Sequence, residues 1–169
     1  WSRIREALKA YVAPPMRWAA VRQDGVLFIN DAYNANPVSM RAALAAFSRV
    51  HVKGMRWLAL GGMRELGKAE REEHLRLGRE IACGGWAGLV TVGELGATIA
   101  EGARIAGWPE EKTVSCRNHA EAAKALRKRV QVEDGVLLKA SRGEHMEDVL
   151  RYWKEEANHE VKDDCCAML

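Results

Sequence analysis

The chain has 169 residues, of which 48% are hydrophobic and 29% are charged, and its formal net charge is +3 at pH 7. This length suits one domain, or one domain with an appendage, and the apolar fraction is sufficient for a sizeable core. Lysine and arginine form no tract, no apolar run reaches the length of a membrane span, and no secretory signal opens the chain. The four cysteines (Cys83, Cys116, Cys165 and Cys166) lack the spacing of a metal site. These features favour neither nucleic acid, nor a membrane, nor a metal as a partner, and they predict a cytoplasmic protein with reduced thiols.

The first residues predict a short helix that is followed by a break. Ile4, Leu8 and Tyr11 share one helical face, and Pro14 and Pro15 end the pattern. The sequence opens directly on this helix and without methionine. We therefore expect residues 1–15 to be the end of a preceding domain with its linker, and the chain to be a fragment of a longer protein.

After the prolines, apolar strand patterns alternate with helical ones. Strands at 17–22 and 26–29 flank Asp24-Gly25, which is a hairpin turn signal. Further strands are predicted at 57–60, 88–92, 113–116 and 135–139, and helices at 37–50, 69–82, 95–106, 120–130 and 144–156. The strand runs are short and continuous, as expected when both faces of a sheet are buried. We predict an α/β domain over residues 16–157, three-layered and Rossmann-like, with a mainly parallel sheet, helices on both faces and a short antiparallel hairpin at its start. Residues 158–169 are predicted to be a flexible tail.

A dense group of polar side chains follows the strand at 26–29. Asp31, Asn34 and Asn36 supply a carboxylate and two amides, and Tyr33 adds a flat ring. Open α/β sheets present ligands at the carboxyl ends of their strands. Asn36 before Pro37 is also typical of a helix N-cap with proline at the first helical position. Capping alone is one interpretation of this loop, but it requires fewer polar groups than the loop carries.

The stretch from Gly62 to Ala69 has the spacing of a phosphate-binding P-loop between a strand and a helix. Ala69 stands where a hydroxyl should hold magnesium, and Glu65 inside the loop would oppose a phosphate. The spacing is therefore weak support for a phosphate site.

A third polar loop, Lys139 to Gly143, follows the last predicted strand. In a doubly wound sheet, this loop, the Asp31 loop and the Gly61–Gly67 loop would share one edge and face one crevice. Ser141 and Arg142 before a helix suit a carboxylate. Such a crevice fits a ligand with both cationic and anionic groups, such as an amino acid or a peptide.

The three loops also carry a family resemblance. The motifs Asp-Ala-Tyr-Asn-Ala-Asn-Pro (31–37), Leu-Gly-Gly-Met-Arg-Glu-Leu-Gly (60–67) and Lys-Ala-Ser-Arg-Gly (139–143) occur in that order. From about Pro15 to Trp153 the chain resembles the C-terminal domain of the Mur ligases. The Tyr-Asn-Ala-Asn-Pro run is most similar to the branch that adds D-alanyl-D-alanine to UDP-N-acetylmuramoyl-tripeptide in peptidoglycan precursor synthesis.

The resemblance implies a cytoplasmic, ATP-dependent amide ligase of three domains, of which this chain is the third. The N-terminal domain would bind the UDP-sugar, and the central domain would hold ATP and Mg²⁺ through a true P-loop. ATP phosphorylates the peptide carboxylate in such enzymes, and the incoming amine attacks the acyl phosphate. Residues 1–15 would then end the central domain, no catalytic or metal-binding residue would lie within this chain alone, and the isolated chain would be inactive.

On the nucleotide side, Arg17 matches a family arginine that reaches ATP phosphates across the domain junction. Asp31 matches an aspartate suited to the ribose hydroxyls, and Asn34 is expected near the nucleotide. On the other side, the resemblance implies that the incoming dipeptide contacts Asn36, Ser141 and Arg142, with Glu65 and Lys139 as further contributors.

The sequence departs from the family pattern at several of these positions. Met16 and Ala140 stand where glycine is usual, Gly62 where an aspartate is common, and Glu144-His145 replaces commoner residues. Gly62 has no carboxylate, so it does not make the contacts that the resemblance implies for that aspartate. His74 matches a family position, but a lone histidine on a helix that faces the sheet is more often a packing or hydrogen-bonding residue.

Two other functions remain open at this point. The same crevice would serve a free-standing, non-catalytic peptide- or nucleotide-binding module, and Gly62 to Lys68 would serve a small P-loop phosphotransferase. The ending Cys166-Ala167-Met168-Leu169 fits a prenylation box formally, but the residues before it are not polybasic, so we interpret it as coincidence.

Overall fold

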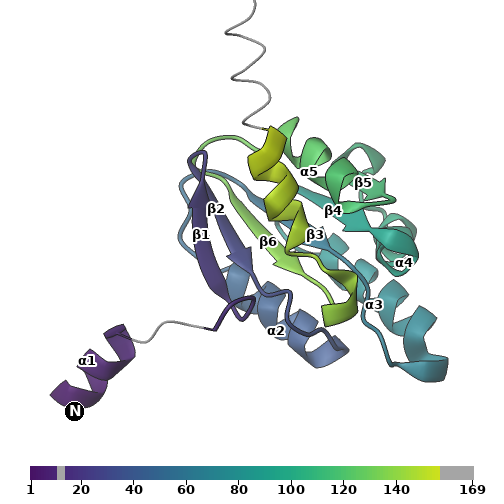
Figure 1. The fold of residues 1–169 in the computed structure, drawn as a ribbon. Helices are drawn as coiled ribbons and strands as arrows, with labels where there is room; N and C mark the ends of the chain where they lie inside the picture. Colours follow the sequence, from purple (N-terminus) through teal and green to yellow (C-terminus); the bar gives the residue numbers. More distant parts are fainter. Residues whose placement is uncertain (11–13, 157–169) are drawn as a thin grey trace, which may run out of the picture.

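The computed structural model describes residues 1–10 and 14–156. Its centre is a six-stranded sheet in the order β1-β2-β6-β3-β4-β5 (Figure 1). Only the β1–β2 pair is antiparallel among these strands, and every other neighbouring pair is parallel. The strands are β1 (Ala19–Gln23), β2 (Val26–Asn30), β3 (Arg56–Leu60), β4 (Gly88–Val92), β5 (Thr113–Cys116) and β6 (Gly135–Lys139). The predicted mainly parallel sheet with an initial hairpin is therefore confirmed.

The hairpin between β1 and β2 closes at Asp24 and Gly25, whose φ angles are 52° and 76°. Two successive positive φ values match the right-handed twist of paired strands, which explains the Asp-Gly signal. The Asp24 carboxylate accepts hydrogen bonds of 2.8 Å from Arg127 Nη2 and from Trp153 Nε1. The tip of the hairpin is thereby tied to two helices on one face of the sheet.

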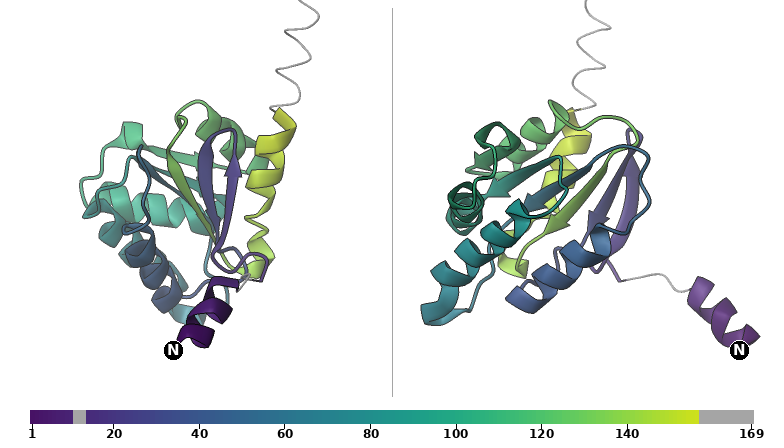
Figure 2. Two further views of the ribbon diagram at one scale, coloured as in Figure 1. Left: turned by 90° about the vertical axis from the view of Figure 1, so that its left-hand side faces the viewer. Right: turned by 180° about the vertical axis from the view of Figure 1, so that it is seen from behind.

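Helices cover both faces of the sheet, which gives the predicted three layers (Figure 2). One face carries α2 (Pro37–Phe47), α3 (Glu70–Ala82) and α4 (Gly93–Ile105), and the other carries α5 (His119–Arg127) and the helical residues 148–156. Two buried clusters correspond to these faces, one around Phe47, Leu58 and Ile81 and the other around Phe28 and Trp153. Burial on both faces is the physical reason for the continuous apolar runs of the strands.

The largest difference from the predicted elements lies after β6. We expected a helix from 144, but a 3-10 turn, η3 (Arg142–Glu144), comes first, and the helix begins at 148. His145 has a φ of 49°, which interrupts any continuous helix at that point. Two further 3-10 turns of the same length, η1 (Gly67–Ala69) and η2 (Glu110–Lys112), precede α3 and β5. Ser141 and Arg142 are consequently presented by a tight turn and not by the start of an α-helix.

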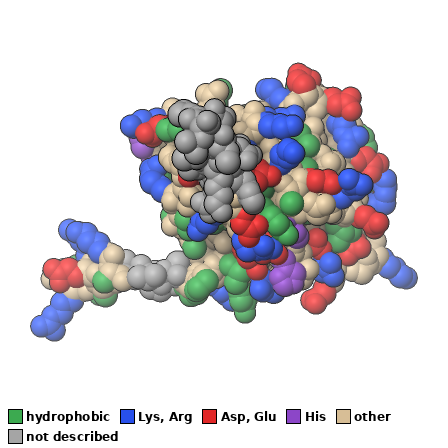
Figure 3. Space-filling view, turned by 45° about the horizontal axis from the view of Figure 1, so that its top comes forward, with side chains coloured by type: hydrophobic (Ala, Val, Ile, Leu, Met, Phe, Trp, Pro, Cys, Tyr) green, Lys and Arg blue, Asp and Glu red, His purple; other side chains and the backbone are tan. Residues whose placement is uncertain are grey.

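The first helix, α1 (Ser2–Ala10), stands off from the sheet in both figures. The predicted end of its pattern at Tyr11 lies outside the described residues, as does the predicted tail at 158–169 with Cys165 and Cys166. None of the helices in the described ranges is long and apolar enough to cross a membrane. Positive and negative side chains are interspersed over the face seen in Figure 3.

Candidate functional site at the carboxyl edge of the sheet

The three polar loops are neighbours at the carboxyl edge of the sheet, as the sequence predicts. β6 lies between β2 and β3, so the loop after β6 is flanked by the other two. Backbone hydrogen bonds join them: the Asp31 amide donates to Leu138 O at 2.9 Å, and the Ser141 amide donates to Gly62 O at 2.9 Å. The site is thus built on the centre of the sheet, where the strands are paired on both sides.

Lys139 ends β6 and is only 2% exposed. Its Nζ donates to Asp31 Oδ2 at 2.6 Å and to the carbonyl oxygen of Asn34 at 2.9 Å. A buried ammonium needs such partners because water is excluded from it. In this structure the contacts of Lys139 hold the Asp31 loop, and the contribution to dipeptide binding that we expected from it stays a prediction.

The Asp31 carboxylate also fixes the segment before β1. Its Oδ1 accepts a hydrogen bond of 3.1 Å from the Trp18 amide, and the Tyr33 amide donates to Met16 O at 3.0 Å. The guanidinium of Arg17 lies over the Tyr33 ring, 3.9 Å from its centroid, and Arg17 remains exposed. The nucleotide-side residues expected from the sequence are therefore brought together, although both oxygens of Asp31 already have protein partners.

Asn36 and Ser141 both have structural partners in the folded chain. Asn36 Oδ1 accepts from the Ser39 amide at 2.8 Å, and the Asn36 amide donates to Ser39 Oγ at 3.0 Å, which is a capping box. The predicted N-cap is thus confirmed. Ser141 Oγ accepts from the Arg64 amide at 2.8 Å and donates to Ala35 O at 3.2 Å, and this residue is 6% exposed. The hydroxyl of Ser141 ties all three loops together.

A cleft of about 300 Å³ opens between these loops. It is lined by Asn34, Arg64, Glu65, Ser141, Arg142 and Gly143. The two guanidiniums on this rim are each paired with a carboxylate: Arg142 Nη1 with Glu147, and Arg64 Nε with Glu144 Oε1 at 2.6 Å. The hydrogen bond with Glu144 raises the pKa of Arg64, so this group stays cationic. Two oriented guanidiniums and an amide side chain suit the carboxylate and peptide groups of a small polar ligand.

Sequence reasoning did not assign Arg64 or Glu147 to the site. Arg64 belongs to the second loop motif, and its position beside Glu65 at a strand end was the signal that could have identified it. The pairing of Arg142 with Glu147 depends on the turn at 142–144, which the helix prediction had missed.

His74 is fully buried and joins α3 to the second loop. Its Nε2 accepts a hydrogen bond of 2.8 Å from the Met63 amide, and its Nδ1 lies 2.6 Å from the carbonyl oxygen of Glu70. This arrangement requires the neutral tautomer with the proton on Nδ1. The interpretation of His74 as a hydrogen-bonding residue of the core is confirmed.

Two backbone amides of the second loop are bound within the protein and are not available to a phosphate. The Met63 amide is bound to His74 and the Arg64 amide to Ser141, while Lys68 is exposed. A Cβ atom at Gly62 would lie 2.6 Å from Leu95 Cβ, so Leu95 fills the room that an aspartate side chain would need. The observed geometry gives no support to a P-loop at this position.

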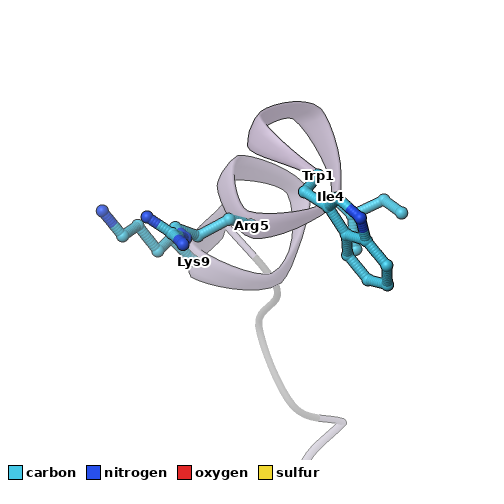
Figure 4. A pocket seen from close by; sticks show the side chains of 4 residues that line it. All are labelled: Trp1, Ile4, Arg5 and Lys9. Carbon is cyan, nitrogen blue, oxygen red and sulfur yellow. The ribbon is translucent and has the colours of Figure 1, made fainter.

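A second hollow lies along α1 and is bounded by Trp1, Ile4, Arg5 and Lys9 (Figure 4). Trp1 and Ile4 lie to one side of the helix axis, and Arg5 and Lys9 lie to the other. Since all four side chains come from one exposed helix and none from the strand ends, we do not assign the site there.

The sequence of the chain is similar to a known protein family and to several of its members. Residues 16–142 match the family model described as Mur ligase, glutamate ligase domain. The chain is 34% identical over 137 residues to the UDP-N-acetylmuramoyl-tripeptide–D-alanyl-D-alanine ligase of Bacillus subtilis, a match that covers 80% of this chain and 30% of that protein. It is 38% identical over 134 residues to the enzyme of the same name from Mycobacterium leprae, covering 71% of this chain and 26% of that protein.

Solved structures agree with these matches. A crystal structure of MurF from Acinetobacter baumannii aligns with a TM-score of 0.77 and 30% identity over 89% of this chain and 33% of that one. The MurF ligase from Thermotoga maritima in complex with ADP aligns with a TM-score of 0.72 and 26% identity over 94% of this chain and 37% of that one. The chain therefore spans only 26–30% of the length of the curated relatives it matches.

Proposed function

Because the chain belongs to the Mur ligase family through its glutamate ligase domain, we propose that it is the dipeptide-binding domain of an ATP-dependent ligase. The ligase would join D-alanyl-D-alanine to UDP-N-acetylmuramoyl-tripeptide in cytoplasmic peptidoglycan precursor synthesis. The names of the B. subtilis and M. leprae relatives support this reaction. The observation that carries the role of this domain is the cleft at the carboxyl edge, which is lined by both Arg64 and Arg142.

In this proposal the cleft receives the carboxylate end of the dipeptide. Arg142 would contact the carboxylate, and Arg64 on the opposite rim would contact either the carboxylate or the peptide oxygen. Glu147 and Glu144 keep the two guanidiniums oriented before the ligand arrives. Ser141 and Asn36 contribute indirectly, since their hydrogen bonds fix the loops that form the walls.

The nucleotide would lie on the side of Arg17, Asp31 and Asn34. Arg17 forms no ion pair with a carboxylate in the described part of the chain, and its exposed guanidinium fits a phosphate. ATP, when bound with Mg²⁺, supplies the phosphoryl group that activates the acceptor carboxylate. We propose that other domains of the same polypeptide hold most of the nucleotide and the UDP-sugar, so this domain alone does not turn over ATP.

The test uses the full-length ligase that carries this domain. It measures ADP release and product formation with D-alanyl-D-alanine as the varied substrate. Arg142→Ala removes a charge-assisted contact worth about 1.5–3 kcal/mol, so we expect KM for the dipeptide to rise about tenfold to a hundredfold. Arg104→Ala, an exposed arginine in the last turn of α4, is the matched control and should leave KM unchanged.

Normal ligation by the double variant Asp31→Ala with Arg142→Ala would refute the site assignment. The reading frame upstream of the Trp1 codon gives a separate check. A P-loop encoded in the same frame supports the ligase, whereas its absence favours a free-standing binding module.

A further inference from the structure

Arg17 stands between two residues that have left-handed backbone conformations. The φ angle is 59° at Met16 and 56° at Trp18. Such angles are unfavourable for side chains with a Cβ atom, and a strained segment persists only where the surrounding structure holds it. Glycine would adopt the φ angle found at Met16 without this strain, since it has no Cβ atom. The backbone that presents Arg17 is therefore held in place by contacts elsewhere.

Those contacts converge on the ion pair of Lys139 and Asp31, whose side chains are 2% and 22% exposed. The Trp18 amide donates to Asp31 Oδ1 at 3.1 Å, and Lys139 Nζ holds the other oxygen, Asp31 Oδ2, at 2.6 Å. Lys139 is 2% exposed and also donates to Asn34 O at 2.9 Å, so its ammonium has a fixed position at the end of the central strand β6. Displacement of Lys139 would free the Asp31 carboxylate and, with it, the strained turn at Trp18.

The side chain of Arg17 has its own support. Its guanidinium lies 3.9 Å from the centroid of the Tyr33 ring, and the Tyr33 amide donates to Met16 O at 3.0 Å. Tyr33 is 43% exposed, so the ring is used as a platform on the surface and not as part of the core. A cation stacked on an aromatic face loses rotational freedom but keeps its N–H groups available to an anion.

We propose that Lys139 and Tyr33 are positioning residues for Arg17: the Lys139–Asp31 pair fixes its backbone, and the Tyr33 ring fixes its guanidinium. This inference rests on the proposed function, in which Arg17 meets the ATP phosphates. It replaces the direct contact with the dipeptide that the sequence suggested for Lys139. The two residues act on the nucleotide through Arg17 and do not touch either substrate.

The experiment is a set of double-mutant cycles in the full-length ligase, with KM for ATP, KM for the dipeptide and kcat measured separately. Tyr33→Leu removes the ring, so we expect KM for ATP to rise about twofold to fivefold, and Tyr33→Phe, which keeps the ring face, should restore it. Lys139→Met should change the ATP parameters in the same direction. Neither change should have a further effect when Arg17→Ala is already present.

Tyr152→Leu is the matched control, because it removes a second tyrosine ring with an arginine over it. The Arg151 guanidinium lies 4.3 Å from the centroid of the Tyr152 ring, and this pair is not on the proposed nucleotide side. It should leave KM for ATP unchanged. The proposal is overturned if Lys139→Met leaves KM for ATP unchanged, or if the effects of Lys139→Met or Tyr33→Leu add fully to that of Arg17→Ala. Thermal melting shows whether Lys139→Met folds. If it does not, the Tyr33 cycle decides.

A wild-type ligase that fails to ligate would refute the proposed function and not this inference. Hydrogen exchange at the Trp18 amide then tests, independently of activity, whether the Lys139–Asp31 pair holds this amide. The amide should be protected in the wild type and exchange faster in Lys139→Met, and equal protection in both would overturn the role of Lys139.

Discussion

His74 offers a sharp test of how the second loop is held at the site. Its fully buried imidazole accepts the hydrogen bond of the Met63 amide through Nε2 and approaches Glu70 O through Nδ1. His74→Asn places an amide nitrogen near the position of Nδ1 but cannot reach the Met63 amide. His74→Gln is longer and places an amide oxygen near the position of Nε2. The two variants therefore separate the two hydrogen bonds of one side chain.

The magnitude follows from the group left unpaired. In His74→Asn the Met63 amide has no acceptor, and Met63 is itself fully buried, so we expect a loss of about 1–3 kcal/mol of unfolding free energy. In His74→Gln the acceptor is retained and the volume is similar, so the loss should stay below about 1.5 kcal/mol. Urea unfolding of the chain gives both values from the shift of the midpoint.

Hydrogen exchange of the Met63 amide supplies the local measurement. We expect protection in the wild type and in His74→Gln, and rapid exchange in His74→Asn. If His74→Asn is as stable as His74→Gln and its Met63 amide stays protected, Nε2 is not the acceptor and the assigned tautomer is wrong.

Three further predictions concern the fold. A methyl group at Gly102 would overlap the carbonyl oxygen of Leu75 between α4 and α3, so Gly102→Ala should lower the urea midpoint by an amount that corresponds to about 1–3 kcal/mol, despite its better helix propensity. Partial burial raises the pKa of Asp24, but hydrogen bonds from neighbouring side chains outweigh it and lower the pKa below its ordinary value of 3.8. The ionised Asp24 therefore stabilises the fold above that pH, and this stabilisation is lost in more acidic solution. The unfolding free energy of Asp24→Asn should lack this loss when it is measured in an acid titration. Burial raises the pKa of Cys116 to about 11, so peptide mapping after iodoacetamide treatment at pH 8 should show Cys83, which is exposed, alkylated well before Cys116.

Features set by neighbouring residues could be predicted from the sequence. Asp24-Gly25 specifies its hairpin because two positive φ angles are needed at adjacent positions, and Asn36-Pro37 specifies a helix start because the cap and the first helical residue are adjacent. The continuous apolar run of β6 predicted a buried parallel strand for the same kind of reason. The polar residues at the strand ends followed from the same pattern, and with them the location of the candidate site.

The partners of those polar residues could not be predicted in this way. Lys139 is 108 residues from Asp31, and nothing near either residue indicates that their charges meet in an ion pair. Ser141, which was expected to face a ligand, lines the cleft, but its hydroxyl also binds Ala35 O and the Arg64 amide. In each case, burial forces a polar group to find a partner inside the protein, and the identity of that partner depends on which strands are neighbours.

The sequence by itself determined the alternation of strands and helices, the hairpin, the helix cap and the edge of the sheet at which the polar loops lie. These depend on periodicity and on local backbone preference, which act over a few residues. The tertiary structure alone decided that β6 enters between β2 and β3, and therefore that Lys139 supports the Asp31 loop and the strained turn around Arg17. The insertion places Lys139, which is distant from Asp31 in the chain, in a buried position where its charge must be paired, and this requirement explains why Lys139 holds the Asp31 loop.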